Sequence, residues 1–357
     1  MNTENSWENA NNTPSPNPES KPFFETGKHF QESPEPDVDT AALVIERIAK
    51  IAEEAGKQPK WDEVMALFDE AENALKRERH LSPDQSHDVE ILFGVGRVMD
   101  RERLREQEEL KKTQVERLDW NSQRLEKGKI NEAAKAREKR EAWWQQQMAL
   151  FILKNRNWEG LEDHLNKLWT PLAVLNKKLL GPKNYRIENE QHGIARLVTT
   201  VKIFEQLGYE CETSGGYYDA VDKIDFVAIK KIAEKEFALI IQAKPTERSD
   251  GPETKFETFY PLPERGAEIP EDAQGVVEWV RKNKSLRAQR LAPILARVPS
   301  EDIRPNEISF PSGIPKQRFL DNLPKECLDQ IRKVEEGQIE NPQRHHKRRI
   351  VYVNKQR

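Results

Sequence analysis

Glu190-Gln-His-Gly-Ile-Ala-Arg-Leu-Val-Thr-Thr-Val-Lys-Ile-Phe-Glu-Gln-Leu-Gly208 is the stretch that decides the fold. Gly208 follows Leu207 at the position where a glycine commonly ends a helix. Projecting the apolar stripe of this helix back by one turn reaches Glu190, so we expect a carboxylate in line with the core. At about 100° per residue, the apolar side chains that form this stripe are Ile194, Leu197, Val198, Val201 and Phe204.

Three short strands are predicted after this helix. Residues 209–213 and 223–229 are separated by a loop containing Ser-Gly-Gly-Tyr-Tyr, which is typical of a β-hairpin. The second strand places Asp225 among apolar neighbours. The following run, Phe-Ala-Leu-Ile-Ile-Gln-Ala-Lys, predicts a third strand, whose period of two puts Gln242 and Lys244 on one face. Polar side chains therefore end a strongly hydrophobic strand.

Asp225 on one strand and Gln242-x-Lys244 on the next resemble the signature of the PD-(D/E)xK nuclease superfamily. The Gln-x-Lys form looks most like the Mrr-like restriction endonucleases and their Holliday-junction-resolvase relatives, which also carry a Glu on the preceding helix, where Glu190 stands. The resemblance covers residues 187–246. Two features depart from the signature, since no proline precedes the Asp and a Gln replaces the second carboxylate. The resemblance implies an α/β protein with a restriction-endonuclease-like core, a small mixed sheet flanked by helices, preceded by a helical arm.

Phosphodiester hydrolysis gives each of these residues a role. A hard divalent cation, Mg²⁺ or Mn²⁺, polarises the phosphate and lowers the pKa of the attacking water, and it prefers oxygen ligands. We therefore expect Asp225, the amide oxygen of Gln242 and Glu190 to hold the metal, with Glu190 restoring the charge that Gln242 lacks. Lys244 would orient the nucleophilic water or stabilise charge on phosphorus. The expected activity is that of an endonuclease acting on nucleic acid, and the resemblance favours DNA over RNA.

Each residue also has a plainer interpretation. A single Asp in a strand more often completes a turn network, and a Lys at a strand end is usually solvated. Asp219 and Asp222 are assigned to the hairpin loop. One alternative function is therefore a catalytically weak or inactive nuclease-fold module that binds nucleic acid or protein through its charged helices. A further alternative is a helical scaffold in which the α/β segment is only structural.

The N-terminal half is predicted to be helical. Residues 1–38 contain six prolines and few aliphatic side chains, which predicts a disordered acidic tail. Two amphipathic helices are expected from Thr40 to Ala55 and from Trp61 to Leu75. Pro83 separates them from Ile91-Leu-Phe-Gly-Val-Gly, which has no preceding strand and is assigned to helix packing, not to phosphate binding.

Residues 99–147 predict a long solvated helix or a helical pair, since their leucines do not follow a clean heptad. Between Lys111 and Gln147, ten lysines and arginines stand against six acids. This excess of basic residues is compatible with a helix that lies along DNA. A connecting helix with many salt bridges is the better interpretation. A further helix is expected to start at Thr170-Pro171 and to stop at Gly181.

The C-terminal part is expected to complete the nuclease domain. Residues 247–269 predict a long proline-containing connection, and residues 271–297 a helix with a basic face. His345 to Val353 combines a basic run with a strand pattern. The predicted units are the tail at 1–38, a charged helical region at 39–155 and the nuclease domain at 156–357.

The amino-acid composition limits what can be expected of the partners and the location of the protein. The formal net charge of −4 does not by itself indicate a nucleic-acid-binding protein. Two cysteines, Cys211 and Cys327, favour a reducing, cytoplasmic location inside the cell without disulfides. We expect no membrane partner, because no run of about 18 apolar residues is present. Many nucleases of this fold act as dimers, so the resemblance also allows a homodimer, although no interface is indicated by the sequence.

Overall fold

The computed structural model describes residues 38–79, 81–116, 119–214, 219, 223–232, 235–246, 253–283, 291–299, 304 and 306–340. The predicted tail lies outside these residues except for Val38, where the first helix begins. The strand predicted from His345 to Val353 also lies outside them. No described helix is long and apolar enough to span a membrane.

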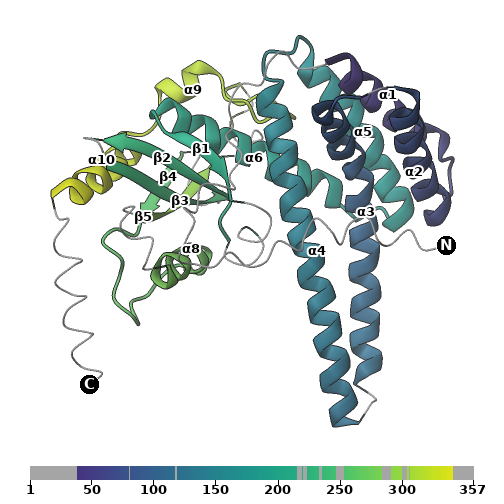
Figure 1. Cartoon of the computed structure of the whole chain (residues 1–357), viewed down its shortest axis with the longest axis horizontal. Coiled ribbons are helices and arrows are strands. Elements are labelled where there is room, and N and C mark those ends of the chain that lie inside the picture. Colours follow the sequence, from purple (N-terminus) through teal and green to yellow (C-terminus); the bar gives the residue numbers. More distant parts are fainter. Residues whose placement is uncertain are drawn as a thin grey trace.

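The N-terminal arm consists of five helices packed beside a small sheet (Figure 1). Its third and fourth helices form the helical pair that the sequence allowed, and this pair extends well beyond the rest of the arm (Figure 1). The third helix begins with a capping box, in which Ser82 and Gln85 satisfy each other's backbone N–H groups. The helices of the arm are α1 (Val38–Glu54), α2 (Trp61–Glu78), α3 (Pro83–Val115), α4 (Trp120–Lys154) and α5 (Leu161–Leu180).

The predicted helix start at Thr170-Pro171 is wrong, because α5 continues through Pro171. A proline inside a helix loses one backbone hydrogen bond and is locally unfavourable. Here Leu168, Trp169 and Leu172 are all buried around it, so packing of the apolar face outweighs the local signal. Gly181 ends the helix with a positive φ of 101°, as the sequence predicted.

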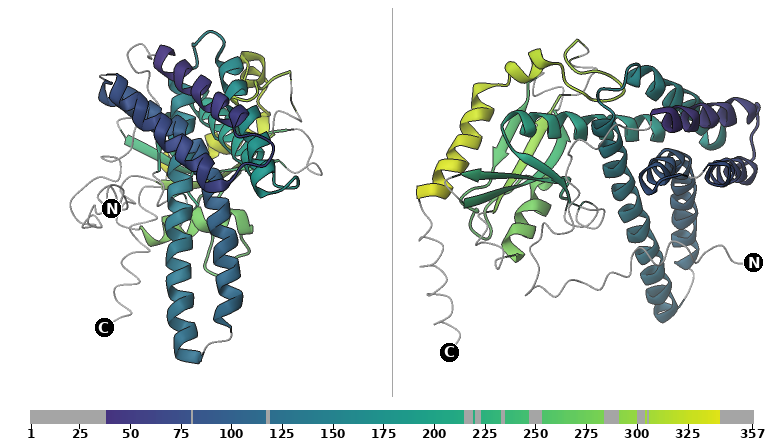
Figure 2. Two further views of the ribbon diagram at one scale, coloured as in Figure 1. Left: turned by 90° about the vertical axis from the view of Figure 1, so that its right-hand side faces the viewer. Right: turned by 45° about the horizontal axis from the view of Figure 1, so that its top comes forward.

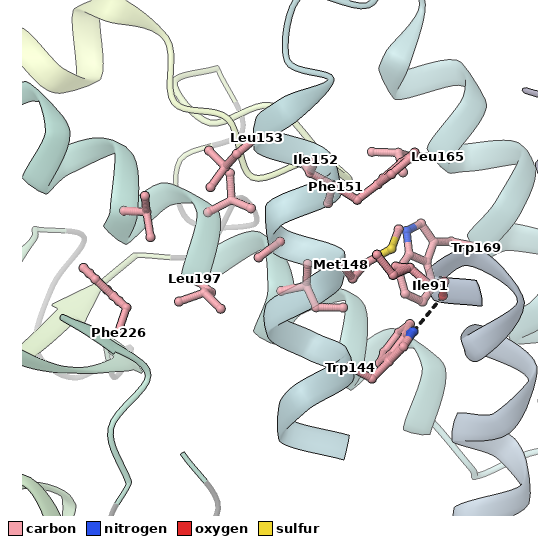
Figure 3. Packing of buried hydrophobic residues seen from close by; sticks show 14 of the residues in the cluster. Ile91, Trp144, Met148, Phe151, Ile152, Leu153, Leu165, Trp169, Leu197 and Phe226 are labelled. Atoms are coloured by element: carbon pink, nitrogen blue, oxygen red, sulfur yellow. Dashed lines mark hydrogen bonds between the residues drawn. The ribbon is translucent and has the colours of Figure 1, made fainter. Parts of the chain in front are cut away.

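The Gly-x-Gly at residues 94–96 is a helix-packing feature, as predicted. A Cβ added at Gly94 would lie 2.6 Å from the Trp144 ring, and one at Gly96 would lie 2.7 Å from the Phe68 ring. The indole of Trp144 donates to the carbonyl of Ile91 at 2.8 Å, a bond visible in Figure 3. The two glycines therefore let α2 and α4 approach α3 closely.

The sheet is mixed, and among the described residues it has five strands in the order β1-β2-β3-β5-β4. β2 runs antiparallel to β1 and β3, β5 is parallel to β3, and β4 is antiparallel to β5. The α/β class and the small mixed sheet flanked by helices are thus as expected. The strands are β1 (Glu210–Thr213), β2 (Phe226–Ile232), β3 (Lys235–Pro245), β4 (Lys255–Thr258) and β5 (Leu291–Val298).

Two helices cover opposite faces of this sheet. α6 (Arg186–Gln206) packs on the face that carries Phe226, and its Phe204 meets that ring edge-on at 5.8 Å. α8 (Glu271–Lys282) covers the face that carries Val227 and Ile240. Alternate residues of the strands thus belong to two separate cores, as the period of two requires.

The prediction of a helix over 271–297 is wrong in its second half, because the helix ends at Lys282 and residues 291–298 form β5. Nearly every side chain of β5 is buried on one face or the other, so its sequence is a continuous apolar run. Such a run does not distinguish a central strand from a buried helix. The loop predicted over 247–269 likewise contains a strand, β4, at the edge of the sheet.

The chain continues through α9 (Gln317–Asp321) and α10 (Lys325–Glu340). α10 lies beside the sheet in the right-hand view of Figure 2 and contacts β4. Glu335 of α10 accepts hydrogen bonds from Tyr209 at 2.8 Å and from Lys230 at 3.0 Å. These bonds tie the end of the described chain to the start of the hairpin.

One hydrophobic core joins the arm to the α6 face of the sheet (Figure 3). Met148 and Phe151 of α4 lie between Trp169 of the arm and Leu197 of α6. α5, which the sequence grouped with the nuclease domain, packs against both α1 and α6. The predicted division after residue 155 stays a prediction, although the packing is continuous across it.

Candidate functional site

Asp225 and the Gln-x-Lys pair meet at the end of the sheet. Asp225 lies just before β2, and its backbone N–H donates to the carbonyl of Ile241 at 2.9 Å. Its carboxylate oxygen Oδ2 accepts a hydrogen bond of 2.5 Å from the backbone N–H of Ala243, the residue between Gln242 and Lys244. The aspartate therefore occupies the position of a strand partner for β3. This contact joins the three residues that the sequence motif grouped.

A second carboxylate, Asp219, lies at the same place. Its Oδ2 accepts a hydrogen bond of 2.9 Å from Nε2 of Gln146 on α4. The same nitrogen lies 3.1 Å from the backbone carbonyl of Asp225 and 2.9 Å from Ser214 Oγ. The fully buried Gln146 therefore connects the arm to Asp219 and to the start of β2.

The assignment of Asp219 to the hairpin loop missed this role. Asp219 precedes Asp225 by six residues and lies 73 residues after its partner Gln146, so its position depends on how the arm packs on the sheet. The acidic residue itself was visible in the sequence. Asp222, the other acid of that loop, lies outside the described residues.

The surroundings of Asp219 and Asp225 raise the pKa of both carboxyl groups. Burial, with the charge of the neighbouring Asp225 as the second cause, raises the pKa of Asp219 to about 8. Burial also raises the pKa of Asp225 to about 6, against the lowering effects of the Ala243 N–H, Lys244 and Arg196. At neutral pH the pair therefore carries less than two negative charges, and a bound cation would displace the remaining proton.

Gln242 presents an unsatisfied oxygen. Only 3% of the residue is exposed, and its Oε1 is buried without a hydrogen-bond partner in the described part of the chain. An unpaired buried amide oxygen is costly in an apolar environment. Such an oxygen can accept a hydrogen bond from a ligand or a water molecule, or it can coordinate a metal ion.

Lys244 is held between the two aspartates and the start of α8. It is near enough to lower the pKa of both Asp219 and Asp225. Its Nζ also lies 3.8 Å from Oδ1 of Asp272, whose other oxygen is 3.2 Å from the Arg297 guanidinium. A contact of 3.8 Å between partly exposed groups is weak, so the ammonium can turn toward a substrate.

Glu190 is buried, as the projection of the helix predicted, with 3% of the residue exposed. Its two oxygens are engaged by protein donors, since Oε1 pairs with Arg186 at 2.7 Å and Oε2 accepts from Gln145. Gln145 and Gln146 are consecutive on α4, so the helix links Glu190 to Asp219 and Asp225. Metal binding by Glu190 stays a prediction, and it would require a cation to replace one of these donors.

The donor set at this site is two carboxylates and one amide. Within the described ranges, no group of three or more His, Cys, Asp or Glu side chains could hold a metal ion. Asp219, Asp225 and Gln242 nevertheless provide oxygen atoms, the type that Mg²⁺ and Mn²⁺ prefer. The unpaired Gln242 Oε1 and the proton-binding carboxyl groups both fit a cation at this position.

No protein family matches this chain, and no similar protein was found among the curated proteins or the solved structures. The function of this chain is therefore inferred from the chemistry of the site.

Proposed function

We propose that this protein is a metal-dependent endonuclease that hydrolyses phosphodiester bonds of nucleic acid, DNA in preference to RNA. The observation that carries the proposal is the bond between the Asp225 carboxylate and the N–H of Ala243, the residue between Gln242 and Lys244. Asp219 adds a second carboxyl group that the motif did not include. Two acids, an unpaired amide oxygen and a lysine at one sheet end suit phosphodiester chemistry.

The residues of this site divide into two roles. Asp219, Asp225 and Gln242 Oε1 would hold Mg²⁺ or Mn²⁺, with Glu190 as a further ligand if it leaves Arg186. The bound ion would supply a Lewis acid for the phosphate and a water of lowered pKa. Lys244 carries the charge that would hold the attacking water or stabilise the phosphate as negative charge develops on it.

We also propose that the α/β part of the chain has a restriction-endonuclease-like core. It is supported by the order of helix α6, hairpin β1–β2 and strand β3, and by helices on both faces of a mixed sheet. We further propose DNA as partner, a homodimer as an allowed assembly and a cytoplasmic location. The last rests on the two cysteines, Cys211 and Cys327, which are both buried free thiols.

Cleavage assays on two variants test the proposed function. With Mg²⁺ or Mn²⁺, wild-type protein should nick supercoiled plasmid, while Asp225→Ala and Lys244→Ala should lose on the order of a hundredfold or more in rate. Thermal melts by circular dichroism should show that Lys244→Ala stays folded, since that side chain is partly exposed. The exposed arginine variant Arg140→Gln is the control and should cleave like wild type. Equal cleavage by wild type and by both site variants would refute the catalytic assignment.

A second candidate is a nuclease-fold module that binds nucleic acid or protein without efficient catalysis. It is favoured by the ion pairs of Glu190 with Arg186 and of Lys244 with Asp272, which occupy two of the motif's charges. Calorimetric titration with Mn²⁺ separates the two functions. Binding that disappears in Asp225→Ala supports the enzyme, whereas heat that is absent or unchanged by the substitution supports the module.

A further inference from the structure

A pocket of about 260 Å³ lies next to the candidate site. It is formed by residues of the α3–α4 pair, by the first residue of α6, and by Asp219 and Lys223. Asp219 is thus shared between the pocket and the carboxylate pair. The cationic side chains that line the pocket are Arg101, Arg105, Arg137, Arg186 and Lys223.

The lining has more cations than acids. Its three acidic residues are Glu138, Glu141 and Asp219, against the five cations. Arg101 and Arg105 are one helical turn apart on α3, so they present their guanidinium groups on the same side. The pocket is therefore positively charged even though the whole chain has a formal charge of −4.

Some of these cations are already paired. Arg186 pairs with Glu141 and Glu190, and Arg137 pairs with Glu108 outside the pocket. A guanidinium has five N–H donors, so an ion pair does not exhaust it. Nε of Arg186 is buried and has no acceptor among the residues that the structure describes. The pocket therefore keeps an excess of positive charge, and one N–H of its Arg186 has no acceptor in the described part of the chain.

We propose that this pocket binds a phosphate group of the nucleic-acid strand on which the Asp219–Asp225 site acts. This inference rests on the proposed function, because the ligand is part of the same substrate. Arginines bind phosphate oxygens in a bidentate manner, and several of them around one pocket are typical of phosphate recognition. The α3–α4 pair is then part of the substrate-binding surface, and it holds the strand beside the carboxylates.

Binding can be measured without cleavage. Fluorescence anisotropy of a labelled DNA oligonucleotide in EDTA gives the affinity of the full chain, and metal is absent from this assay by design. We expect Arg101→Gln/Arg105→Gln to weaken binding by about tenfold and to lower the slope of log Kd against log salt by about one, because one phosphate contact is lost. Arg105→Gln alone removes an exposed side chain, so it provides a variant whose folding is secure.

The matched control removes two arginines from the same pair of helices. Arg124 and Arg140 are exposed on α4 and do not line the pocket, so Arg124→Gln/Arg140→Gln removes the same charge. We expect it to change the affinity less than twofold. Equal losses of DNA affinity in both double variants would show a general charge effect and would overturn the proposal that the pocket binds phosphate. Wild-type affinity in Arg101→Gln/Arg105→Gln and in Arg105→Gln would overturn it as well.

Two further outcomes separate the pocket from the proposed function. If the oligonucleotide binds through the pocket but wild type cleaves nothing with Mg²⁺ or Mn²⁺, the pocket is supported and the nuclease function fails. If the wild type cleaves DNA and the pocket variants bind the oligonucleotide like wild type, the nuclease function is supported. The proposal that the pocket binds a phosphate of the strand is then wrong. Inorganic phosphate is the remaining probe. If it binds as tightly as the oligonucleotide and is lost in the same variants, the ligand is a small phosphate compound and the strand proposal is overturned.

Discussion

At the scale of single residues, the candidate site depends on where protons are bound. The folded protein raises the pKa of Asp219 to about 8 and that of Asp225 to about 6, in both cases chiefly by burial. Between the ordinary aspartate pKa and these values, the folded state binds more protons than the unfolded state. The unfolding free energy therefore falls as pH rises from about 4 to about 8, by at most about 1.4 kcal/mol per pH unit for each extra proton.

Asp219→Asn tests this dependence, because asparagine has the shape of the protonated acid and can still accept from Gln146. Urea denaturation in EDTA should give similar stabilities for wild type and variant at about pH 3, where Asp219 is protonated in both the folded and the unfolded state. At pH 8 the variant should be the more stable protein, since only wild type must ionise a buried group. Asp69→Asn, which changes an exposed residue of α2, should leave the pH profile unchanged. Parallel profiles for Asp219→Asn and wild type would contradict the burial argument.

At the scale of elements, close helix packing in the arm can be tested with two glycines. Gly94→Ala places a methyl group 2.6 Å from the Trp144 ring, so we expect a loss of about 1–3 kcal/mol through overpacking. Gly128 lies in α4 with nothing within 4 Å, and Gly128→Ala should gain up to about 1 kcal/mol from helix propensity. Thermal melts measure both changes. Effects of the same sign in the two variants would show that Gly94 is not a packing glycine.

The sequence predicted those elements in which local pattern and tertiary packing agree. The amphipathic stripe of α6, the hairpin that follows it and the alternation of β3 are local features, and they predicted Asp225 beside the strand in which Ala243 now donates to its carboxylate. β5 was missed because a strand buried on both faces has no alternation. Pro171 was misread because the packing of its neighbours outweighs the cost of a proline inside α5.

The two parts of the site that the sequence did not predict both come from distant contacts. Asp219 becomes a site residue only because Gln146, far earlier in the chain, donates to it. The basic pocket needs arginines of α3 beside Arg186 of α6, and no sequence spacing indicates that these helices meet. Local pattern therefore predicted the strands of the site, whereas the contribution of the arm could be found only in three dimensions.

At the scale of the whole molecule, the arm and the sheet share one core, so they should not be separable. Met148, Phe151 and Ile152 of α4 are buried between the arm and α6. Burying one such side chain stabilises a protein by about 1.5–3 kcal/mol, and the total stability of a domain is only about 5–15 kcal/mol. A fragment of residues 156–357 also lacks Gln146, which donates a hydrogen bond to Asp219. We therefore expect it to show no cooperative thermal transition and no metal-dependent cleavage.

The matched truncation removes residues 1–37, which precede α1. Their composition is too polar to bury much apolar surface, so residues 38–357 should keep the melting temperature and the metal-dependent activity of the full chain. Circular dichroism melts and plasmid nicking on both fragments give the comparison. A cooperative melt of the 156–357 fragment at the full-length temperature would show that the C-terminal part is an independent domain, as the sequence division predicted. A lower melting temperature for 38–357 would instead show that the first 37 residues contribute to the folded core, because no other part of the chain differs between the two proteins.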